Sequence, residues 1–499
     1  MELQFKGSSC RCLKPAAREV RSTELTQEVR LNDGMPDIGR VITSWGQIIL
    51  RSKEWQSDQI TVSGGVLVWI LYVPEDGTPP RCIDTWVPFQ LKWEAETTDR
   101  EGPVRVSPLL RFVDSRTVSA RKIMIRASVA AMGEALYPWE AETFSPEELP
   151  EDVQILQSTY PLRLPKEAGE KTFLLDEDLN MPAGAVPMER LLCYTIVPQI
   201  QEKRVAGDKV IIRGTGNLHV VYRCPEGRIR TEDFEVPISQ YAQLENTYGT
   251  EGQADVQMAV TSLEMDPTET QQLRLKCGMV AQYLISDRVL TELTEDAYSP
   301  RRDVQMHVEE LKLPVMMEQR TEMIPVHQQL TGICGETVDV QFYPDYPRQQ
   351  KGTDRILLDL PGQFQVLYYA EDGSLQGAGG RWEGQMEIPA DMQCRIDAIV
   401  QHHGKVQMEG RTSELNLNTH YRMQINATGQ QGMNMVTGLQ LGDLEEPDPA
   451  RPSLILCRSE GESLWNMAKR CGSTMAEIRR LNGLTEEPKE NRMLLIPVN

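Results

Sequence analysis

The sequence predicts a mainly β protein, with three tandem β-rich, sandwich-like domains followed by a small βααβ domain. Three observations lead to this fold class. A strand-like apolar stretch that ends in a tyrosine and a glycine turn occurs three times, at a spacing of about 150 residues. Helix-type periodicity is scarce before residue 460. Beyond that point the pattern changes to two short helices between two short strands.

Each copy of the repeated turn places a Tyr five residues before a Gly. The three pairs are Tyr72 and Gly77, Tyr222 and Gly227, and Tyr368 and Gly373. The tyrosines lie 150 and 146 residues apart. An acidic residue followed by Gly between two apolar runs favours a hairpin, because Gly accepts the positive φ angle that such turns require. Each copy is therefore predicted to form a β-hairpin.

Other features recur at the same spacing. Gly64 and Gly214 each lie eight residues before the Tyr, whereas the third copy has Leu360 there. A later stretch of each copy has apolar residues at every second position, which predicts a strand with one buried face. The residues expected on that face are Ile123, Ile125, Ala127 and Val129, then Leu273, Leu275, Cys277 and Met279, then Tyr421, Met423, Ile425 and Ala427.

The spacing of the repeats gives the domain boundaries. The predicted segments are three β domains at residues 15–147, 158–299 and 310–440, a linker at 441–452 and a last domain at 453–499. Acidic, proline-containing stretches separate the β domains, at residues 145–152 and around Ser299-Pro300. The linker at 441–452 is the clearest, because its prolines and acidic residues cannot build a core.

The C-terminal region carries the signals of two capped helices between two strands. Apolar, strand-like segments begin and end it. Ser463 is predicted to cap a first helix, and Thr474 with Glu477 forms a capping box for a second. Gly483 supplies the left-handed residue that ends the second helix. The residues expected on the buried helix faces are Leu464, Trp465, Ala468, Cys471, Ile478 and Leu481.

From Gly461 to Pro497 the order of glycines, caps, Trp465, Asn482 and the final Ile-Pro resembles the LysM motif. The resemblance implies a βααβ fold with a shallow groove between two loops, and LysM domains usually bind polymers of N-acetylglucosamine such as peptidoglycan. One departure is Cys471, where many glycan-binding relatives have Tyr. The candidate groove residues are Glu460, Gly461, Glu462, Ser463, Arg479, Arg480, Asn482, Gly483 and Leu484.

The upstream repeats resemble the SPOCS domain of endospore-forming Firmicutes. The resemblance rests on residues 35–42, on Val62 with Gly64, and on the turn from Tyr72 to Gly77. Three such domains followed by a LysM are similar to clostridial spore-coat morphogenetic proteins that bind the basement-layer ATPase of the coat. This resemblance implies a protein of the mother-cell cytoplasm that is located at the forespore surface, with a LysM that contributes to the contact with the ATPase.

Charge and hydropathy exclude several classes of partner. The chain has 52 Lys and Arg against 73 Asp and Glu, a net charge of −21. Nucleic-acid recognition and docking to an anionic membrane both need a basic surface, so we expect neither. The N-terminus lacks the apolar core of a secretory signal. The longest apolar run, residues 66–73, is far shorter than the roughly 20 residues of a spanning helix, so no transmembrane segment is expected.

The motifs of enzymes and metal sites are absent from the sequence. The ten cysteines include a single close pair, Cys10 and Cys12, so reduced thiols without a metal are expected. Among the six histidines, His402 and His403 are adjacent and would point to opposite faces of a strand. No nucleophile elbow, phosphate-binding loop or zinc-protease helix occurs. We therefore predict a non-enzymatic protein without a cofactor.

Three functions are compatible with these observations. In the first, the protein is a scaffold or adaptor in spore-coat assembly, whose LysM binds a coat morphogenetic ATPase-like protein. In the second, the LysM binds peptidoglycan of the cell wall or spore cortex, and the β domains are spacers. The third, an unrecognised hydrolase, has no catalytic residues to support it. Residues 453–499 carry seven Lys and Arg and six acidic residues, which favours a protein partner because charged rims steer protein association.

Overall fold

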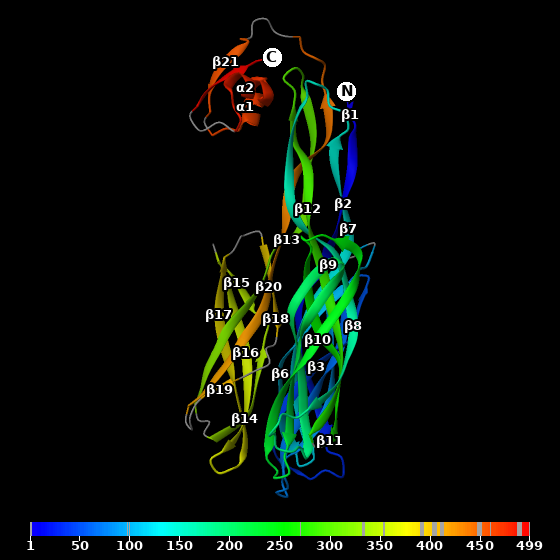
Figure 1. Ribbon diagram of the computed structural model, residues 1–499, viewed down its shortest axis with the longest axis vertical. Helices are drawn as coiled ribbons and strands as arrows, with labels where there is room; N and C mark the ends of the chain where they lie inside the picture. Colours follow the sequence, from blue (N-terminus) through cyan, green and yellow to red (C-terminus); the bar gives the residue numbers. More distant parts are fainter. Residues whose placement is uncertain are drawn as a thin grey trace.

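The computed structural model confirms the mainly β fold class. It describes residues 2–96, 98, 100–269, 271–331, 335–352, 355–389, 394–401, 407–409, 414–446, 452–459, 461–486 and 492–498. Within these ranges every element is a strand except two short helices near the C-terminus, which lie at one end of an elongated molecule (Figure 1). No helix in the described part of the chain is long and apolar enough to cross a membrane.

Three long antiparallel ribbons organise the molecule. Each consists of two strands that lie far apart in the sequence and enclose one repeat. The pairs are β2 (Phe5–Arg30) with β7 (Lys122–Pro146), β8 (Gln154–Asn180) with β12 (Gln272–Tyr298), and β13 (Val304–Thr331) with β20 (Glu414–Leu441). Strands of this length span roughly 80 Å. The stretches that the ribbons enclose, residues 5–146, 154–298 and 304–441, are called here the first, second and third unit.

Shorter strands complete the first unit. β6 joins the ribbon, while β3, β4 and β5 form a separate three-stranded sheet. Their bounds are β3 (Ile38–Gln56), β4 (Gln59–Pro74), β5 (Arg81–Glu94) and β6 (Val104–Ser119). The two sheets share one hydrophobic core, in which Ile70 of β4 and Ile125 of β7 are fully buried. Two sheets packed face to face over one core are the sandwich-like arrangement that the sequence predicts.

The other two units follow the same plan. In the second, β11 joins the ribbon and β9 pairs with β10. In the third, β16 pairs with β14, β15 and β17, while β18 and β19 pair with β20; β1, from the N-terminus of the chain, also pairs with β20. The bounds are β9 (Arg190–Arg223), β10 (Ile229–Tyr248), β11 (Gln253–Glu269), β14 (Gly335–Pro344), β15 (Arg348–Lys351), β16 (Arg355–Ala370), β17 (Leu375–Pro389), β18 (Cys394–Gln401), β19 (Gln407–Glu409) and β1 (Glu2–Leu3).

The three predicted hairpins are present in the structure. They connect β4 to β5, β9 to β10, and β16 to β17. Gly77, Gly227 and Gly373 have φ angles of +73°, +83° and +78°, which a residue with a Cβ atom rarely adopts. The alternating strands also have their predicted buried faces. Every residue expected there is at most 4% exposed, apart from Ala427, whose side chain lies outside the described part.

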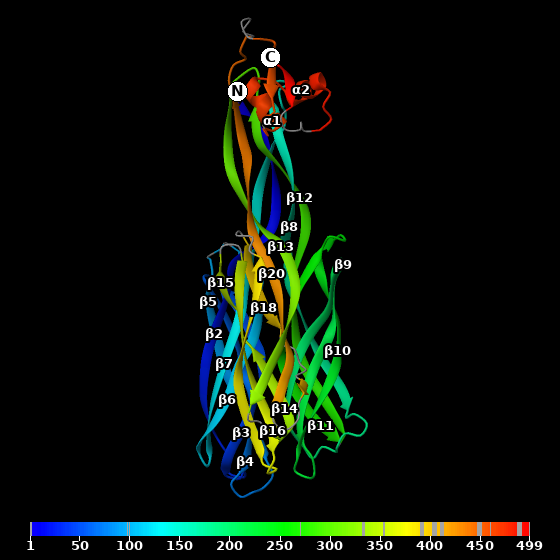
Figure 2. The ribbon, with the colours of Figure 1, turned by 90° about the vertical axis from the view of Figure 1, so that its left-hand side faces the viewer.

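The ends of the three ribbons extend beyond the sheets and form a stalk (Figures 1 and 2). The chain passes from one unit to the next at this end, through residues 147–153 and 299–303. These connections are tied together, because Arg302 Nε donates to Asp152 Oδ2 at 2.6 Å. The hydrogen bonds from Arg302 lower the pKa of Asp152 to about 2. The two proline-containing connections are therefore joined by an ion pair at the tip of the stalk.

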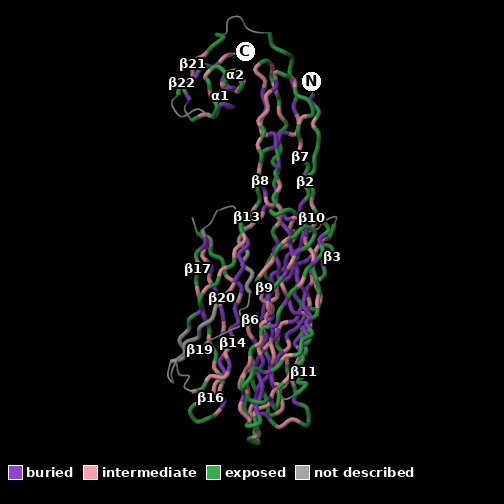
Figure 3. The backbone as a smooth tube through the Cα atoms, in the orientation of Figure 1, coloured by how far each residue is buried: buried purple, intermediate pink, exposed green. Residues whose placement is uncertain are grey.

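Below the stalk the three units pack against one another through shared buried clusters. One cluster joins Trp45 of the first unit, Val221 of the second and Leu367 of the third, each at most 2% exposed. Figure 3 shows the buried residues concentrated in this body of packed sheets. The predicted division into separately folding domains stays a prediction.

Candidate functional site

The C-terminal module has the order of elements that its sequence predicts. β21 (Leu454–Arg458) pairs with β22 (Met493–Pro497), and α1 (Leu464–Cys471) and α2 (Met475–Asn482) lie between them in the chain. This βααβ arrangement is compatible with the fold that the LysM resemblance implies.

The predicted caps define both helices. Ser463 Oγ accepts a hydrogen bond from Asn466 N at 3.2 Å, and Thr474 Oγ1 accepts one from Glu477 N at 3.2 Å. Each bond satisfies a backbone N–H that has no partner within the first helical turn. Gly483 follows α2 with a φ of +61° and ends it in the left-handed conformation.

The two helices and two strands enclose a small core. Its fully buried members are Leu464, Met467, Ala468, Ile478, Leu494 and Ile496. The prediction that Leu481 shares the buried face of α2 with Ile478 is wrong, because 45% of Leu481 is exposed. Residues three positions apart differ by about 60° around a helix axis. Ile478 therefore points into the core, whereas Leu481 lies to one side of it and is partly open to solvent.

The module packs against the tip of the β8–β12 ribbon at the end of the stalk (Figures 1 and 2). Asp296 accepts a hydrogen bond from Trp465 Nε1 at 2.7 Å and lies 2.6 Å from Lys469 Nζ. Tyr298 donates to the backbone oxygen of Ser473 at 3.0 Å. The rings of Tyr298 and Trp465 meet edge to face, with centroids 4.8 Å apart. Trp465 is therefore occupied in packing, as the sequence analysis expects, and does not form an exposed platform for a sugar.

The first half of the predicted groove is only partly described. Glu460 lies outside the described residues. Gly461 is exposed with a φ of +77°. Glu462 forms an ion pair with Arg470, with Oε2 and Nη2 2.9 Å apart. Ser463 serves as the cap of α1. The contacts of this loop are thus made within the module.

The second half of the predicted groove is similarly engaged. Asn482 Nδ2 donates to Leu495 O at 2.6 Å, and Asn482 Oδ1 accepts from Leu495 N at 2.8 Å, so this side chain fastens α2 to β22. Gly483 ends α2, and Leu484 packs against the core. Arg479 is half-buried and Arg480 is exposed. Most of these residues support the fold of the module, and a ligand groove between the two loops stays a prediction.

The most exposed apolar surface of the module is instead the outer face of its two-stranded sheet. Leu454 is 47% exposed, Leu456 58%, Met493 50% and Leu495 38%. Leu456 lies directly opposite Leu495 in the register, so their side chains share one face of the sheet. We call these four residues the apolar sheet face.

This face was not among the predictions above, although the sequence contains a signal for it. The segments Leu-Ile-Leu-Cys and Met-Leu-Leu-Ile are apolar at consecutive positions. Successive strand residues point to opposite faces, and the helices can cover only one face of a two-stranded sheet. The other face must then be apolar and open unless something outside the module covers it.

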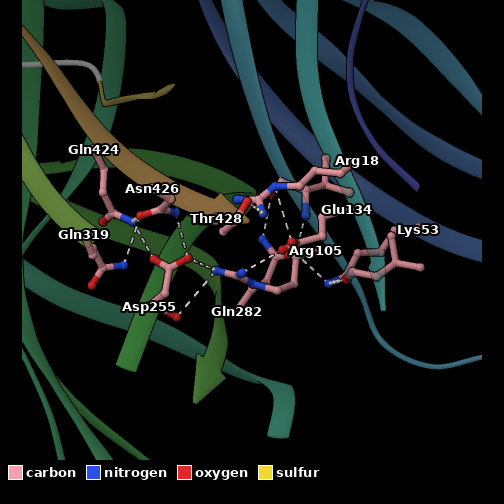
Figure 4. Close-up of polar contacts among 12 residues, drawn as sticks. Arg18, Lys53, Arg105, Glu134, Asp255, Gln282, Gln319, Gln424, Asn426 and Thr428 are labelled. Carbon is pink, nitrogen blue, oxygen red and sulfur yellow. Dashed lines mark hydrogen bonds and ion pairs between the residues drawn. The ribbon is translucent and has the colours of Figure 1, made fainter. Parts of the chain in front are cut away.

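A second constellation, which the sequence did not reveal, is a buried ionic cluster where the three units meet (Figure 4). Arg105 of the first unit donates to Glu134 Oε2 at 2.8 Å and to Asp255 Oδ2, from the second unit, at 2.7 Å. Gln424 of the third unit donates to Asp255 Oδ1 at 2.6 Å, and Asn426 Nδ2 lies 3.3 Å from Asp255 Oδ2. One carboxylate of the second unit therefore receives hydrogen bonds from both of the other units.

The charges of this cluster compensate one another. Burial alone would raise the pKa of Asp255, but Arg105 and Lys203 outweigh it and hold that pKa well below its usual range. The side chains of Arg105 and Asp255 are at most 4% exposed. A buried charge is stable only when it is paired and hydrogen-bonded. The cluster thus stabilises the contacts between the units.

A further three-way contact centres on Asp339 of the third unit. Trp45 Nε1 of the first unit donates to Asp339 Oδ2 at 2.7 Å. His219 of the second unit lies between two carboxylates, with Nε2 3.1 Å from Asp339 Oδ1 and Nδ1 2.7 Å from Asp233 Oδ1. Burial alone would lower the pKa of His219, but the charge of Asp339 and the hydrogen bonds to both carboxylates raise it to about 10.

The residues considered for metal binding have ordinary structural surroundings where they are described. Cys10 and Cys12 are buried on β2, and burial raises the pKa of the Cys12 thiol to about 12. His402 and His403 lie outside the described residues. Within the described ranges, no three His, Cys, Asp or Glu side chains are placed to hold a metal ion.

The structure defines a mainly β protein with three repeated units and a small βααβ module at its tip. Residues 187–267 match the family model described as SipL, SPOCS domain. The matched segment covers β9, β10 and nearly all of β11, in the second unit. The match supports the SPOCS resemblance and indicates a role related to sporulation. Searches of curated proteins and of solved structures found no match to the chain.

Proposed function

We propose that this protein is a non-enzymatic scaffold in spore-coat assembly, which binds a coat morphogenetic ATPase through its C-terminal module. The SPOCS match supports the sporulation setting. The mother-cell side of the forespore surface is the location that fits this role. The second unit holds the module through Asp296 and Tyr298, so a partner bound to the module would be carried on the end of the stalk.

The observation that carries the proposal is the apolar sheet face. Leu456 and Leu495 stand opposite each other with about half of their surface open to solvent. Exposed apolar side chains that gather on one face of a small module are typical of protein-binding sites. Partner burial of these leucines would contribute free energy in proportion to the apolar area removed from water.

The rim of this face favours a protein partner over a sugar polymer. Arg458 lies opposite Met493 in the register, and Arg492 directly precedes Met493; both arginines are exposed. An apolar centre with basic residues at its edge complements a protein surface with an apolar centre and an acidic rim. A neutral glycan needs hydrogen bonds and flat ring contacts, and Trp465, the module's aromatic ring on α1, is buried against Tyr298.

A paired assay on the purified full chain tests the proposal against the peptidoglycan alternative. In one arm the chain is mixed with the purified basement-layer ATPase of the coat and captured. In the other it is sedimented with insoluble peptidoglycan. We expect capture of the ATPase that weakens as salt is raised, because the charged rim contributes to association, and no sedimentation above background. Sedimentation with peptidoglycan without capture of the ATPase would make the cell-wall or cortex binder the better function.

A further inference from the structure

We propose that Cys457 and Cys471 are a redox-active pair, which forms a disulfide between β21 and α1 when the protein meets an oxidising small-molecule disulfide. Their Sγ atoms lie 4.0 Å apart, close to van der Waals contact. Both thiols are free in the structure. This inference stands on the geometry of the module and does not depend on what the module binds.

The positions of the two cysteines favour the bond. Cys457 alternates with the exposed Leu456 and Arg458 along β21, so its side chain points toward the helices. Cys471 is the last residue of α1, and both thiols pack at the edge of the module's core. A disulfide requires the sulfurs to approach to about 2 Å. Rotation about the Cα–Cβ bonds can supply much of that approach, because each sulfur is displaced when its side chain rotates.

The chemistry balances with oxidised glutathione as the oxidant. The thiolate of one cysteine attacks a sulfur of oxidised glutathione, forms a mixed disulfide and releases one glutathione thiolate. The second cysteine's thiolate then attacks the protein sulfur of that mixed disulfide and releases the other glutathione. Two protein thiols are oxidised, one glutathione disulfide is reduced to two thiols, and the protons of the cysteines pass to the departing thiolates. Burial raises the pKa of Cys471, so the exchange should accelerate as the pH rises.

The bond would stabilise the module by closing a loop of the chain. The ring would run from β21 through the cap of α1 to the end of that helix, and it would include the Glu462–Arg470 ion pair. A crosslink removes conformational entropy from the unfolded chain, and for a loop of roughly 15 residues the effect is substantial. The module would thus be looser in a reducing compartment and more rigid after exposure to an oxidising one.

Cys10 and Cys12 provide an internal comparison within the same chain. They are a second pair of cysteines, two positions apart on one face of β2. Side chains in that relation have Cβ atoms about 6.6 Å apart, whereas a disulfide needs roughly 3.5–4.5 Å. This pair should therefore stay reduced under conditions that link Cys457 to Cys471.

Peptide mapping of the full chain after incubation with oxidised glutathione tests the proposal. Remaining thiols are alkylated and the chain is digested with trypsin, which separates the two cysteines by cutting after Arg458 and Arg470. We expect peptide 423–458 joined to peptide 471–479 by a disulfide that a reductant removes. We also expect hydrogen exchange of the α1 amides to slow by about tenfold to a hundredfold on oxidation.

Two variants make the result specific. Cys457→Ser should abolish the joined peptide and leave glutathione on Cys471. Cys82→Ser, which changes a half-buried cysteine of the first unit, should leave the joined peptide intact. Alkylation of both Cys457 and Cys471 in the wild-type chain after prolonged oxidation would overturn the proposal. Links from either cysteine to Cys82 as abundant as the proposed link would overturn it as well.

Discussion

Single buried charges connect the three units. Asp255 receives hydrogen bonds from Arg105 of the first unit and Gln424 of the third. Asp339 receives one from Trp45 and faces His219. Removing one member of a buried ion pair is costly, because the remaining charge has neither water nor a partner. The contacts between units should therefore depend on a few side chains more strongly than on the many exposed ion pairs.

Replacing Asp255 with Asn tests this dependence. The variant leaves the buried Arg105 with Glu134 as its remaining anion, so we expect a loss of about 3–5 kcal/mol of stability against denaturant. Asp176→Asn is the matched control in the same unit. Asp176 pairs with Arg274 at 3.0 Å on the surface, where water and salt screen an ion pair and it contributes little to stability. Equal shifts of the denaturation midpoint in the two variants would show that the buried cluster does not stabilise the contacts between the units.

The charge of His219 predicts a specific pH dependence. The ordinary pKa of His is about 6.5, and in the folded protein that of His219 is raised to about 10. The folded state thus binds the proton more tightly. The stabilisation is complete below pH 6.5, declines as the pH rises and is lost above pH 10.

The variant His219→Gln makes this dependence measurable. At pH 7 it should be less stable than the wild type by about 3 kcal/mol, because Asp339 loses its cation. The difference should shrink as denaturation is repeated at increasing pH up to 10, since His219 then becomes neutral in the wild type. A difference in stability that stays constant between pH 7 and pH 10 would show that His219 is not charged in the folded protein.

Among the elements, the two helices of the C-terminal module offer the sharpest comparison. Ile478 and Leu481 lie on the same helix, but Ile478 is fully buried and Leu481 is 45% exposed. Ile478→Asp places a charge in a small core at a cost of several kcal/mol, which is comparable to the stability of so small a module. We expect hydrogen exchange across residues 454–498 of the full chain to become fast in Ile478→Asp and to stay slow in Leu481→Asp. The opposite order would mean that the face of α2 is assigned incorrectly.

Much of the secondary structure could be predicted because its signals are local. The turn glycines and helix caps act within a few residues, and period-two alternation identifies a buried strand face. Alternation does not say which strand is the partner. The pairing of β2 with β7 or β8 with β12 joins residues from opposite ends of a unit, so the long ribbons and the stalk did not follow from the sequence.

The candidate site could be predicted only in part for a similar reason. The caps and the buried position of Trp465 follow from local pattern. Arg105 and Asp255 look like ordinary surface charges in the sequence, and their contact joins residues 150 positions apart. The exposed face formed by Leu456 and Leu495 could have been predicted, since both strands are apolar at consecutive positions.

Across the whole molecule, the arrangement separates a packed body from a small module at the end of a stalk (Figure 2). Buried clusters and ionic contacts hold the three units together, while Asp296 and Tyr298 hold the module. Such an arrangement suits an adaptor, because a partner bound to the module at the tip would be held away from any other protein that binds the packed body. In the proposed function, recognition therefore lies at the module and structural support in the units.

The most direct test of the proposed role of the module is the affinity of the full chain for the basement-layer ATPase. It is measured for the variants Leu456→Glu and Leu290→Glu and compared with the wild type. The two leucines are similarly exposed, at 58% and 65%, but Leu456 lies on the apolar sheet face and Leu290 on β12. We expect Leu456→Glu to raise the Kd at least about tenfold, as for a central interface residue, and Leu290→Glu to leave it within about twofold. Hydrogen exchange of the module confirms that Leu456→Glu remains folded. Unchanged affinity in a folded Leu456→Glu variant, or an equal loss in Leu290→Glu, would contradict the account.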